Sequence, residues 1–136
     1  MADPISPELR RLVMARADYR CEYCLLPEAV ALHRHEPDHI VPVQHGGATT
    51  EENLACACLR CNRHKGPNVG SFDPITGVLT PFFHPRQQAW RDHFQLNDAY
   101  IEPLTPEGRV TVLILRLNSP ERVAERKLLL AAGVYP

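Results

Sequence analysis

Two pairs of cysteines, each with two residues between its members, most constrain what this chain can fold into. The pairs are Cys21 with Cys24 and Cys58 with Cys61, and 33 residues separate them. Four thiols at this spacing are typical of a structural zinc site, where the metal supplies folding free energy to a small module. We therefore predict that these four cysteines bind Zn²⁺. The fifth, Cys56, lies in an apolar stretch and is expected to be a buried core residue.

The compartment follows from the cysteines and from the start of the chain. Residues 1–4 lack the charged and apolar regions of a signal peptide, and zinc-bound thiols suit a reducing compartment better than disulfides do. The longest apolar run, Val110 to Leu115, is far shorter than the ~18–20 residues that cross a membrane. We therefore expect a cytoplasmic protein with no membrane segment.

The net charge of the chain limits how it could bind nucleic acid. The formal net charge is −1, and four zinc-bound thiolates make the balance more negative. This argues against a protein that coats polyanions without discrimination. A local basic group remains in Arg60, Arg63, His64 and Lys65, so a restricted contact with nucleic acid is compatible with the sequence.

Local signals predict an α+β chain of short elements. Three Ser/Thr-Pro-Glu strings, at Ser6, Thr105 and Ser119, mark helix starts, and the last helix is expected to end near Gly133. The regions between them predict a short strand over 39–43, a helix beginning at Asn62 and ending at Gly66, a turn over 72–77 followed by a strand over 78–83, and a hairpin around 97–98. In that hairpin, residues 90–94 are expected to be the first strand.

The segment between the cysteine pairs carries residues suited to cutting a phosphodiester. Such a reaction needs a divalent cation at the scissile phosphate and a base that deprotonates water. Mg²⁺ prefers oxygen ligands, which Asp38 and Asn62 offer, and histidine accepts a proton near neutral pH. His39 adjoins Asp38, and Asn62 directly follows Cys61. We therefore expect zinc to hold both ends of a catalytic loop.

The same residues fall in a recognisable order. The segment contains Asp38-His39-Ile40-Val41-Pro42 with Gly46-Gly47, then Asn53-Leu54, then Cys58-x-x-Cys61-Asn62-x-x-Lys65-Gly66. This order resembles the HNH endonuclease family, four-cysteine zinc subgroup, with the close match over about 15–70. A later string over 73–94 is similar to a C-terminal extension found on some bacterial members.

The resemblance implies a fold and a role for each site residue. It implies a small zinc-stabilised ββα-metal core with an N-terminal helix over 1–71, and an extension over 72–136, a β-hairpin plus helices, packed on that core. His39 is the implied general base and Asp38 a ligand of the catalytic Mg²⁺ or Mn²⁺. Asn53 ties the loop between the two strands. Asn62 stands where the family has histidine or asparagine as a metal ligand.

The implied activity is hydrolysis of DNA to 5′-phosphate and 3′-hydroxyl ends, with double-stranded DNA as the expected partner. Lys65, His64 and Arg63 are candidate phosphate contacts. The alternative is a non-catalytic zinc module that binds nucleic acid or a protein partner. In that case the aromatic residues of 72–136 could form the contact surface, although such residues are more often core. The sequence does not indicate an oligomeric state.

Overall fold

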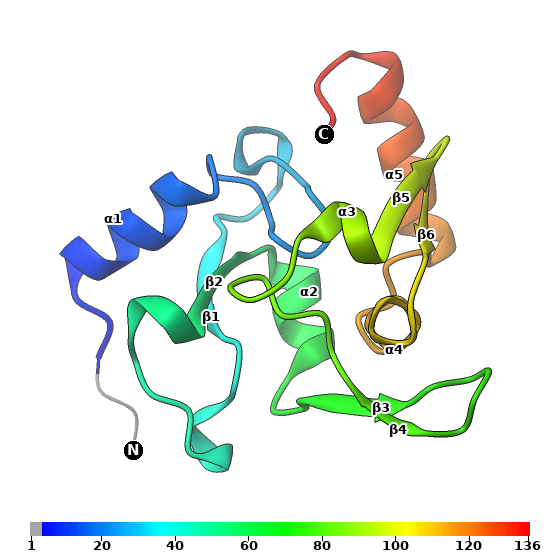
Figure 1. Cartoon of the computed structure of the whole chain (residues 1–136). Coiled ribbons are helices and arrows are strands. Elements are labelled where there is room, and N and C mark those ends of the chain that lie inside the picture. Colours follow the sequence, from blue (N-terminus) through cyan, green and yellow to red (C-terminus); the bar gives the residue numbers. More distant parts are fainter. Residues whose placement is uncertain (1–3) are drawn as a thin grey trace.

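The structure, a computed structural model, describes residues 4–136. The helices are α1 (Pro7–Arg16), α2 (Leu59–Lys65), α3 (Trp90–His93), α4 (Pro106–Ile114) and α5 (Pro120–Ala131). The strands are β1 (Glu36–His39), β2 (Leu54–Ala57), β3 (Gly70–Phe72), β4 (Leu79–Pro81), β5 (Phe94–Asn97) and β6 (Tyr100–Pro103). Across the described residues the strands form three antiparallel pairs, β1–β2, β3–β4 and β5–β6, with helices around them (Figure 1). This mixed content confirms the α+β class.

The β1–β2 pair and helix α2 form a ββα unit. Asp38 lies opposite Ala55 in the antiparallel register. Strand β2 continues into α2 through Cys58, whose Sγ accepts a hydrogen bond from the backbone N–H of Cys61 and so caps the helix. Because of this thiol cap, α2 begins at Leu59, three residues before the predicted start. It ends at Lys65, before Gly66, as predicted.

The prediction of a strand over 39–43 is wrong in position, because β1 covers Glu36–His39 and ends where the predicted strand begins. Ile40 still donates its N–H to the carbonyl of Asn53 (2.8 Å), but the chain then leaves the sheet. Pro42 has no N–H to continue the ladder. The following residues form a loop with 3₁₀ turns at Val43–His45 and Glu51–Asn53.

The Asn53 side chain closes this loop in the manner expected from the sequence. Its Oδ1 accepts a hydrogen bond from the N–H of Val41 (2.9 Å), and its Nδ2 donates to the carbonyls of Val41 (3.0 Å) and Ala48 (2.8 Å). Gly47 lies against the carbonyl of Val41. A Cβ atom at position 47 would be 1.6 Å from that carbonyl oxygen. The loop therefore requires both the amide and the glycine.

Helix α1 covers the outer face of β2. It begins as predicted, with the Oγ of Ser6 accepting a hydrogen bond from the N–H of Leu9 (3.1 Å). Its buried residues Val13 and Met14 pack with Leu54 and with Cys56, which is fully buried. Cys56 is therefore a core residue, as its apolar surroundings predicted.

The larger apolar cluster is shared by the two parts of the chain. It joins Tyr23 and Ala55, near the cysteines, to Phe83, Phe94 and Val110 of the C-terminal part. The rings of Phe83 and Phe94 meet edge to face, 5.3 Å between centroids. Most aromatic residues after residue 72 therefore serve the core rather than an exposed contact surface.

The C-terminal helices begin where the sequence predicted. The Oγ1 of Thr105 accepts a hydrogen bond from the N–H of Gly108 (3.1 Å) at the start of α4, and Ser119 is the N-cap residue of α5. Helix α4 holds the β3–β4 hairpin through a buried ion pair. The guanidinium of Arg109 donates to both carboxylate oxygens of Asp73 (2.8 and 2.7 Å).

The hairpin predicted around 97–98 is confirmed as β5–β6, with Asp98 at positive φ in its turn. Residues 90–93, however, form the short helix α3 rather than a strand. A tertiary contact accounts for this difference, since the indole Nε1 of Trp90 donates to the carbonyl of Tyr23 (2.9 Å). Within residues 4–136, no helix is long and apolar enough to cross a membrane.

Replacing Gly47 with Ala should destabilise the loop between β1 and β2. The added methyl group must displace the Val41 carbonyl or the Asn53 amide, at a cost of about 1–3 kcal/mol, typical of overpacking. Gly133→Ala is the control, since that Cβ meets nothing and only the positive φ costs about 1 kcal/mol. Urea unfolding and limited proteolysis within 40–53 measure the effect. Equal losses in the two variants, with an intact loop, would contradict it.

Candidate functional site

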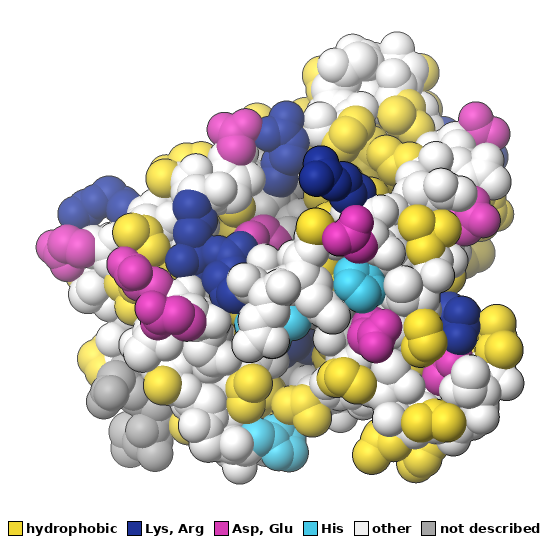
Figure 2. Space-filling model, in the orientation of Figure 1, with side chains coloured by type: hydrophobic (Ala, Val, Ile, Leu, Met, Phe, Trp, Pro, Cys, Tyr) yellow, Lys and Arg dark blue, Asp and Glu magenta, His cyan; other side chains and the backbone are white. Residues whose placement is uncertain are grey.

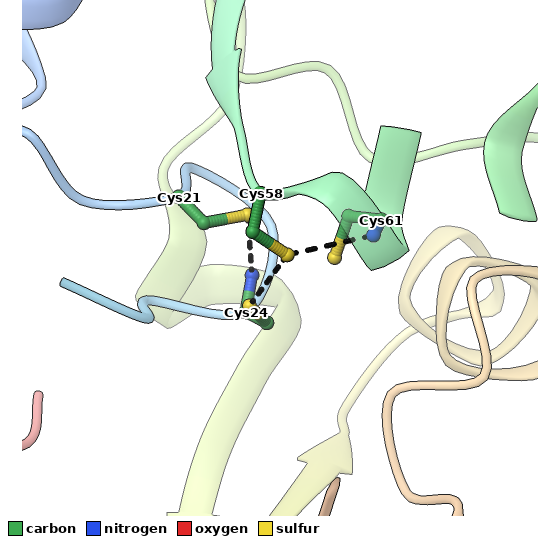
Figure 3. A group of neighbouring side chains, drawn as sticks. All are labelled: Cys21, Cys24, Cys58 and Cys61. Atoms are coloured by element: carbon green, nitrogen blue, oxygen red, sulfur yellow. Dashed lines mark hydrogen bonds between the residues drawn. The ribbon is translucent and has the colours of Figure 1, made fainter. Parts of the chain in front are cut away.

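The four paired cysteines meet in one buried cluster. Their sulfur atoms all lie within 4.8 Å of one another, and Figure 3 shows them converging from the loop after α1 and from the start of α2. A tetrahedral zinc ion with Zn–S bonds of ~2.3 Å places its sulfurs about 3.8 Å apart. The Sγ atoms of Cys24 and Cys58 are 3.7 Å apart. The donor set, the burial and this spacing therefore fit a structural zinc ion, held by Cys21, Cys24, Cys58 and Cys61.

Helix α5 places a buried cation against this cluster. Arg122 is 4% exposed and donates to the Sγ of Cys61 (3.1 Å) and to the carbonyl of Leu115 (2.9 Å). Burial alone lowers the pKa of Arg122, but the facing thiolates of Cys61, Cys24 and Cys58 raise it above its usual value. The guanidinium therefore stays charged and offsets the negative charge of a tetrathiolate centre.

A second contact ties the C-terminal part to the first cysteine pair. The hydroxyl of Tyr135 donates to the carbonyl of Cys24 (2.7 Å) and is buried there. Together with the bond from Trp90 to Tyr23, it fixes the backbone of the first cysteine turn from the outside. The extension therefore helps to position the cysteine cluster.

Asp38 lies in a buried ion pair on the face of β1 that meets α2. Its Oδ2 is 3.2 Å from the Nζ of Lys65 and accepts a hydrogen bond from the Tyr23 hydroxyl (3.0 Å). Burial raises the pKa of the Asp38 carboxyl above its usual value, although Lys65 and Tyr23 act to lower it. The carboxylate therefore depends on these two donors for its charge.

The His39 ring belongs to a different group of contacts. Neighbouring residues of a strand point to opposite faces, and His39 Nε2 lies 2.9 Å from the hydroxyl of Thr49 in the loop. The His39 backbone carbonyl remains near Asp38, since it accepts a hydrogen bond from Lys65 Nζ (2.9 Å). The structure thus joins Asp38, Tyr23 and Lys65 on one side of β1, and His39 with Thr49 on the other.

Asn62 lies on the same face of α2 as Lys65, because residues three apart are neighbours on a helix surface. Since Lys65 reaches Asp38 from that face, Asn62 also faces β1. It is half-buried, and its backbone N–H donates to Cys58 (3.0 Å), which fixes it beside the metal cluster. Within residues 4–136 the side-chain amide of Asn62 has no hydrogen-bond partner, so its oxygen can serve as a ligand.

The three candidate phosphate contacts have different surroundings. Lys65 is 1% exposed and paired with Asp38, so its ammonium does not reach the surface where a phosphate contact was expected. Arg63 is exposed, and His64 is half-buried. Burial lowers the pKa of His64, and Arg116, Arg122 and Arg60 lower it further.

Sequence reasoning missed three residues of this region: Tyr23, Thr49 and Arg122. Tyr23 had a weak signal, since it lies between the cysteines of the first pair. Thr49 and Arg122 had none, because Thr49 is one of several polar loop residues and Arg122 lies 61 residues from Cys61. Only the folded chain shows that they touch the histidine and the thiolates.

Replacing Cys58 with Ala should abolish zinc binding and unfold the segment around the cysteines. Structural zinc contributes apparent folding free energy of about 10 kcal/mol in small modules. Cys56→Ala is the matched control, because that neighbouring buried thiol lies outside the cluster and its loss should leave one zinc per chain. Metal analysis and circular dichroism measure both. A Cys58→Ala variant with a full equivalent of zinc would refute the assignment.

Replacing Lys65 with Ala should cost about 3–5 kcal/mol in unfolding free energy, because it leaves the Asp38 charge buried without its partner. Lys127→Ala, which removes an exposed lysine, should stay within about 0.5 kcal/mol of the wild type. Adding Asp38→Asn to the Lys65 variant should recover part of the loss. Urea unfolding at neutral pH tests the cycle, and strictly additive losses would argue against the ion pair.

A comparison with protein families finds a match to the segment that contains the cysteine cluster and the site residues. The family model described as HNH endonuclease matches residues 21–68, from the first zinc cysteine to just beyond α2. A search of curated proteins finds no match to the chain. The matched segment contains all four clustered cysteines, the ββα unit and the loop closed by Asn53. Residues 21–68 of this chain are therefore similar to HNH endonuclease domains, and the four clustered cysteines are consistent with the four-cysteine subgroup of that family.

Proposed function

We propose that the protein is a metal-dependent endonuclease that hydrolyses phosphodiester bonds in DNA, leaving 5′-phosphate and 3′-hydroxyl ends. One observation carries the proposal. The HNH match covers the segment whose two ends meet at the cysteine cluster, with Asp38 and His39 on strand β1 between the cysteine pairs and Asn62 directly after Cys61 on α2. Double-stranded DNA is the proposed substrate. We also propose that the protein is cytoplasmic, because zinc-bound thiols suit a reducing compartment.

His39 is the proposed general base. The tautomer with its proton on Nε2 donates to the Thr49 hydroxyl and leaves the lone pair of Nδ1 to take a proton from water. A base held by a third group in this way keeps its orientation during the reaction. Thr49 is thus a positioning residue, and the loop closed by Asn53 holds Thr49 in place.

Asp38 and Asn62 are the proposed holders of one Mg²⁺ or Mn²⁺. Their carboxylate and amide oxygens are the hard ligands that such ions prefer. The ammonium of Lys65 lies 3.2 Å from this carboxylate, and a bound ion would share the carboxylate with it. When bound, the ion supplies electrostatic stabilisation to the charge that develops on the phosphate and the leaving oxygen. Tyr23 keeps the carboxylate oriented by its hydrogen bond.

A non-catalytic zinc module that binds nucleic acid or protein is the second candidate. One observation favours it: the Asp38 carboxylate is already neutralised by Lys65 and lies on the opposite face of β1 from the contact between His39 and Thr49. The two candidates differ in whether His39 matters for chemistry. They therefore differ in a measurable activity rather than in stability or zinc content.

The decisive experiment is nicking of supercoiled plasmid with Mg²⁺ or Mn²⁺. His39→Ala should lower the nicking rate by about 10²–10⁴-fold, the usual contribution of a general base. His33→Ala removes an exposed histidine outside this group and should nick like the wild type. DNA ligase should reseal the product, because it needs the 5′-phosphate and 3′-hydroxyl ends proposed here.

The outcomes separate the candidates. Equal nicking by the wild type and His39→Ala would refute His39 as the base. No nicking by any zinc-loaded protein, together with retained DNA binding, would establish the binding module instead. A nick that ligase cannot seal would refute the proposed product ends.

A further inference from the structure

The β3–β4 hairpin carries an apolar surface that nothing in residues 4–136 covers. Figure 2 shows apolar side chains gathered over this hairpin, at the lower right of the view. The exposed fractions of these side chains lie between 42% and 74%. The outer hairpin face, as we name it, consists of Val69, Phe72, Ile75, Val78 and Leu79.

Strand register explains why the central pair of these side chains, Phe72 and Leu79, is bare. Ser71 lies opposite Thr80, and Thr80 is 6% exposed because α4 packs against both strands. Phe72 lies directly opposite Leu79, one residue along, and so points to the other face. That cross-strand pair forms the centre of the outer hairpin face, 64% and 68% exposed. Soluble proteins rarely leave apolar patches of this kind without an interaction partner.

The charge of the region indicates which partner fits. Residues 66–83 contain one charged side chain, Asp73, which is 1% exposed and neutralised by Arg109. Nucleic acid needs cations at its contact surface, and this face offers none. A two-fold contact places identical patches against each other, so an uncharged apolar patch is self-complementary. A second copy of the chain therefore suits the face better than DNA.

A cavity that could accept apolar side chains adjoins the outer hairpin face. A half-open cavity of about 410 Å³ is lined by Val69 and Leu79 of the hairpin, by Phe83, and by Ile40 and Val41 at the start of the loop. It is mainly apolar in its lining residues. The surface thus offers both protruding side chains and a hollow beside them, as a specific contact between two identical surfaces requires.

We propose that the outer hairpin face is the dimer interface of this protein, with a second copy as its occupant. At roughly 100 Å² for each of five side chains, a two-fold contact buries about 1,000 Å² in total, which is below the roughly 1,200–2,000 Å² of stable specific interfaces and within the range of weak, transient ones. The dimer is therefore a reversible one. Because Ile40 and Val41 directly follow His39, the contact lies beside the proposed catalytic loop of each copy.

This position gives the dimer a consequence for cleavage, which rests on the proposed function. One site cuts one strand, so a monomer leaves nicks, whereas two sites held together can cut both strands in one encounter. The dimer should convert supercoiled plasmid to linear product with less nicked intermediate than a monomeric variant does.

The test is sedimentation velocity of the zinc-loaded protein from low micromolar to near-millimolar concentration. The wild type should shift from monomer to dimer, and Phe72→Asp combined with Leu79→Asp should remain monomeric with unchanged zinc content and melting temperature. Leu128→Asp is the matched control, because that leucine is 73% exposed on α5, outside the outer hairpin face, and its variant should dimerise like the wild type.

Each other result overturns the proposal. A wild type that stays monomeric throughout would show that the outer hairpin face is not a dimer interface. A dimer that survives the double substitution lies elsewhere on the molecule. Loss of association in Leu128→Asp as well shows unspecific apolar contact. Sedimentation needs no cleavage, so its outcome is independent of the result for His39→Ala.

Discussion

The convergence of four sulfur atoms is the constraint on which the rest of the structure depends. Cys21 and Cys24 belong to the loop after α1, whereas Cys58 and Cys61 mark the start of α2. A metal ion that joins them fixes the distance between the two ends of the intervening segment. Strands β1 and β2, the loop closed by Asn53, Asp38 and His39 all lie within that segment, and Asn62 follows its end on α2. The extension contributes from outside, because Arg122 contacts the thiolates.

Buried charge organises the interior of this small protein. Each buried ion costs several kcal/mol unless it is paired and hydrogen-bonded, so its partners are not interchangeable. Arg122 has the thiolates and the Leu115 carbonyl, whereas Lys65 has Asp38 and the His39 carbonyl. The first set aligns α5 with the metal cluster and the second aligns α2 with β1. These pairs therefore specify how the elements are placed, beyond what apolar packing alone would select.

The parts that the sequence predicted are those determined by neighbours in the chain. The Ser6 and Thr105 caps act over three residues, and the cysteine pairs have spacing that a metal ion demands. The errors lie where distant contacts decide. The α3 helix forms where a strand was expected, at the residue whose indole bonds to Tyr23, 67 residues away. Lys65 turned inward to Asp38 over 27 residues, which no local pattern could indicate.

The contact between Arg122 and the cysteine cluster also bears on synthesis of the chain. A ribosome adds roughly 5–20 residues per second, so the 61 residues between Cys61 and Arg122 take roughly 3–12 s. Throughout that interval the complete thiol set is present without its buried counter-charge. A nascent chain thus passes through a stage in which its sulfur ligands are exposed to competing metals and oxidants, and the arrival of α5 ends that vulnerable period.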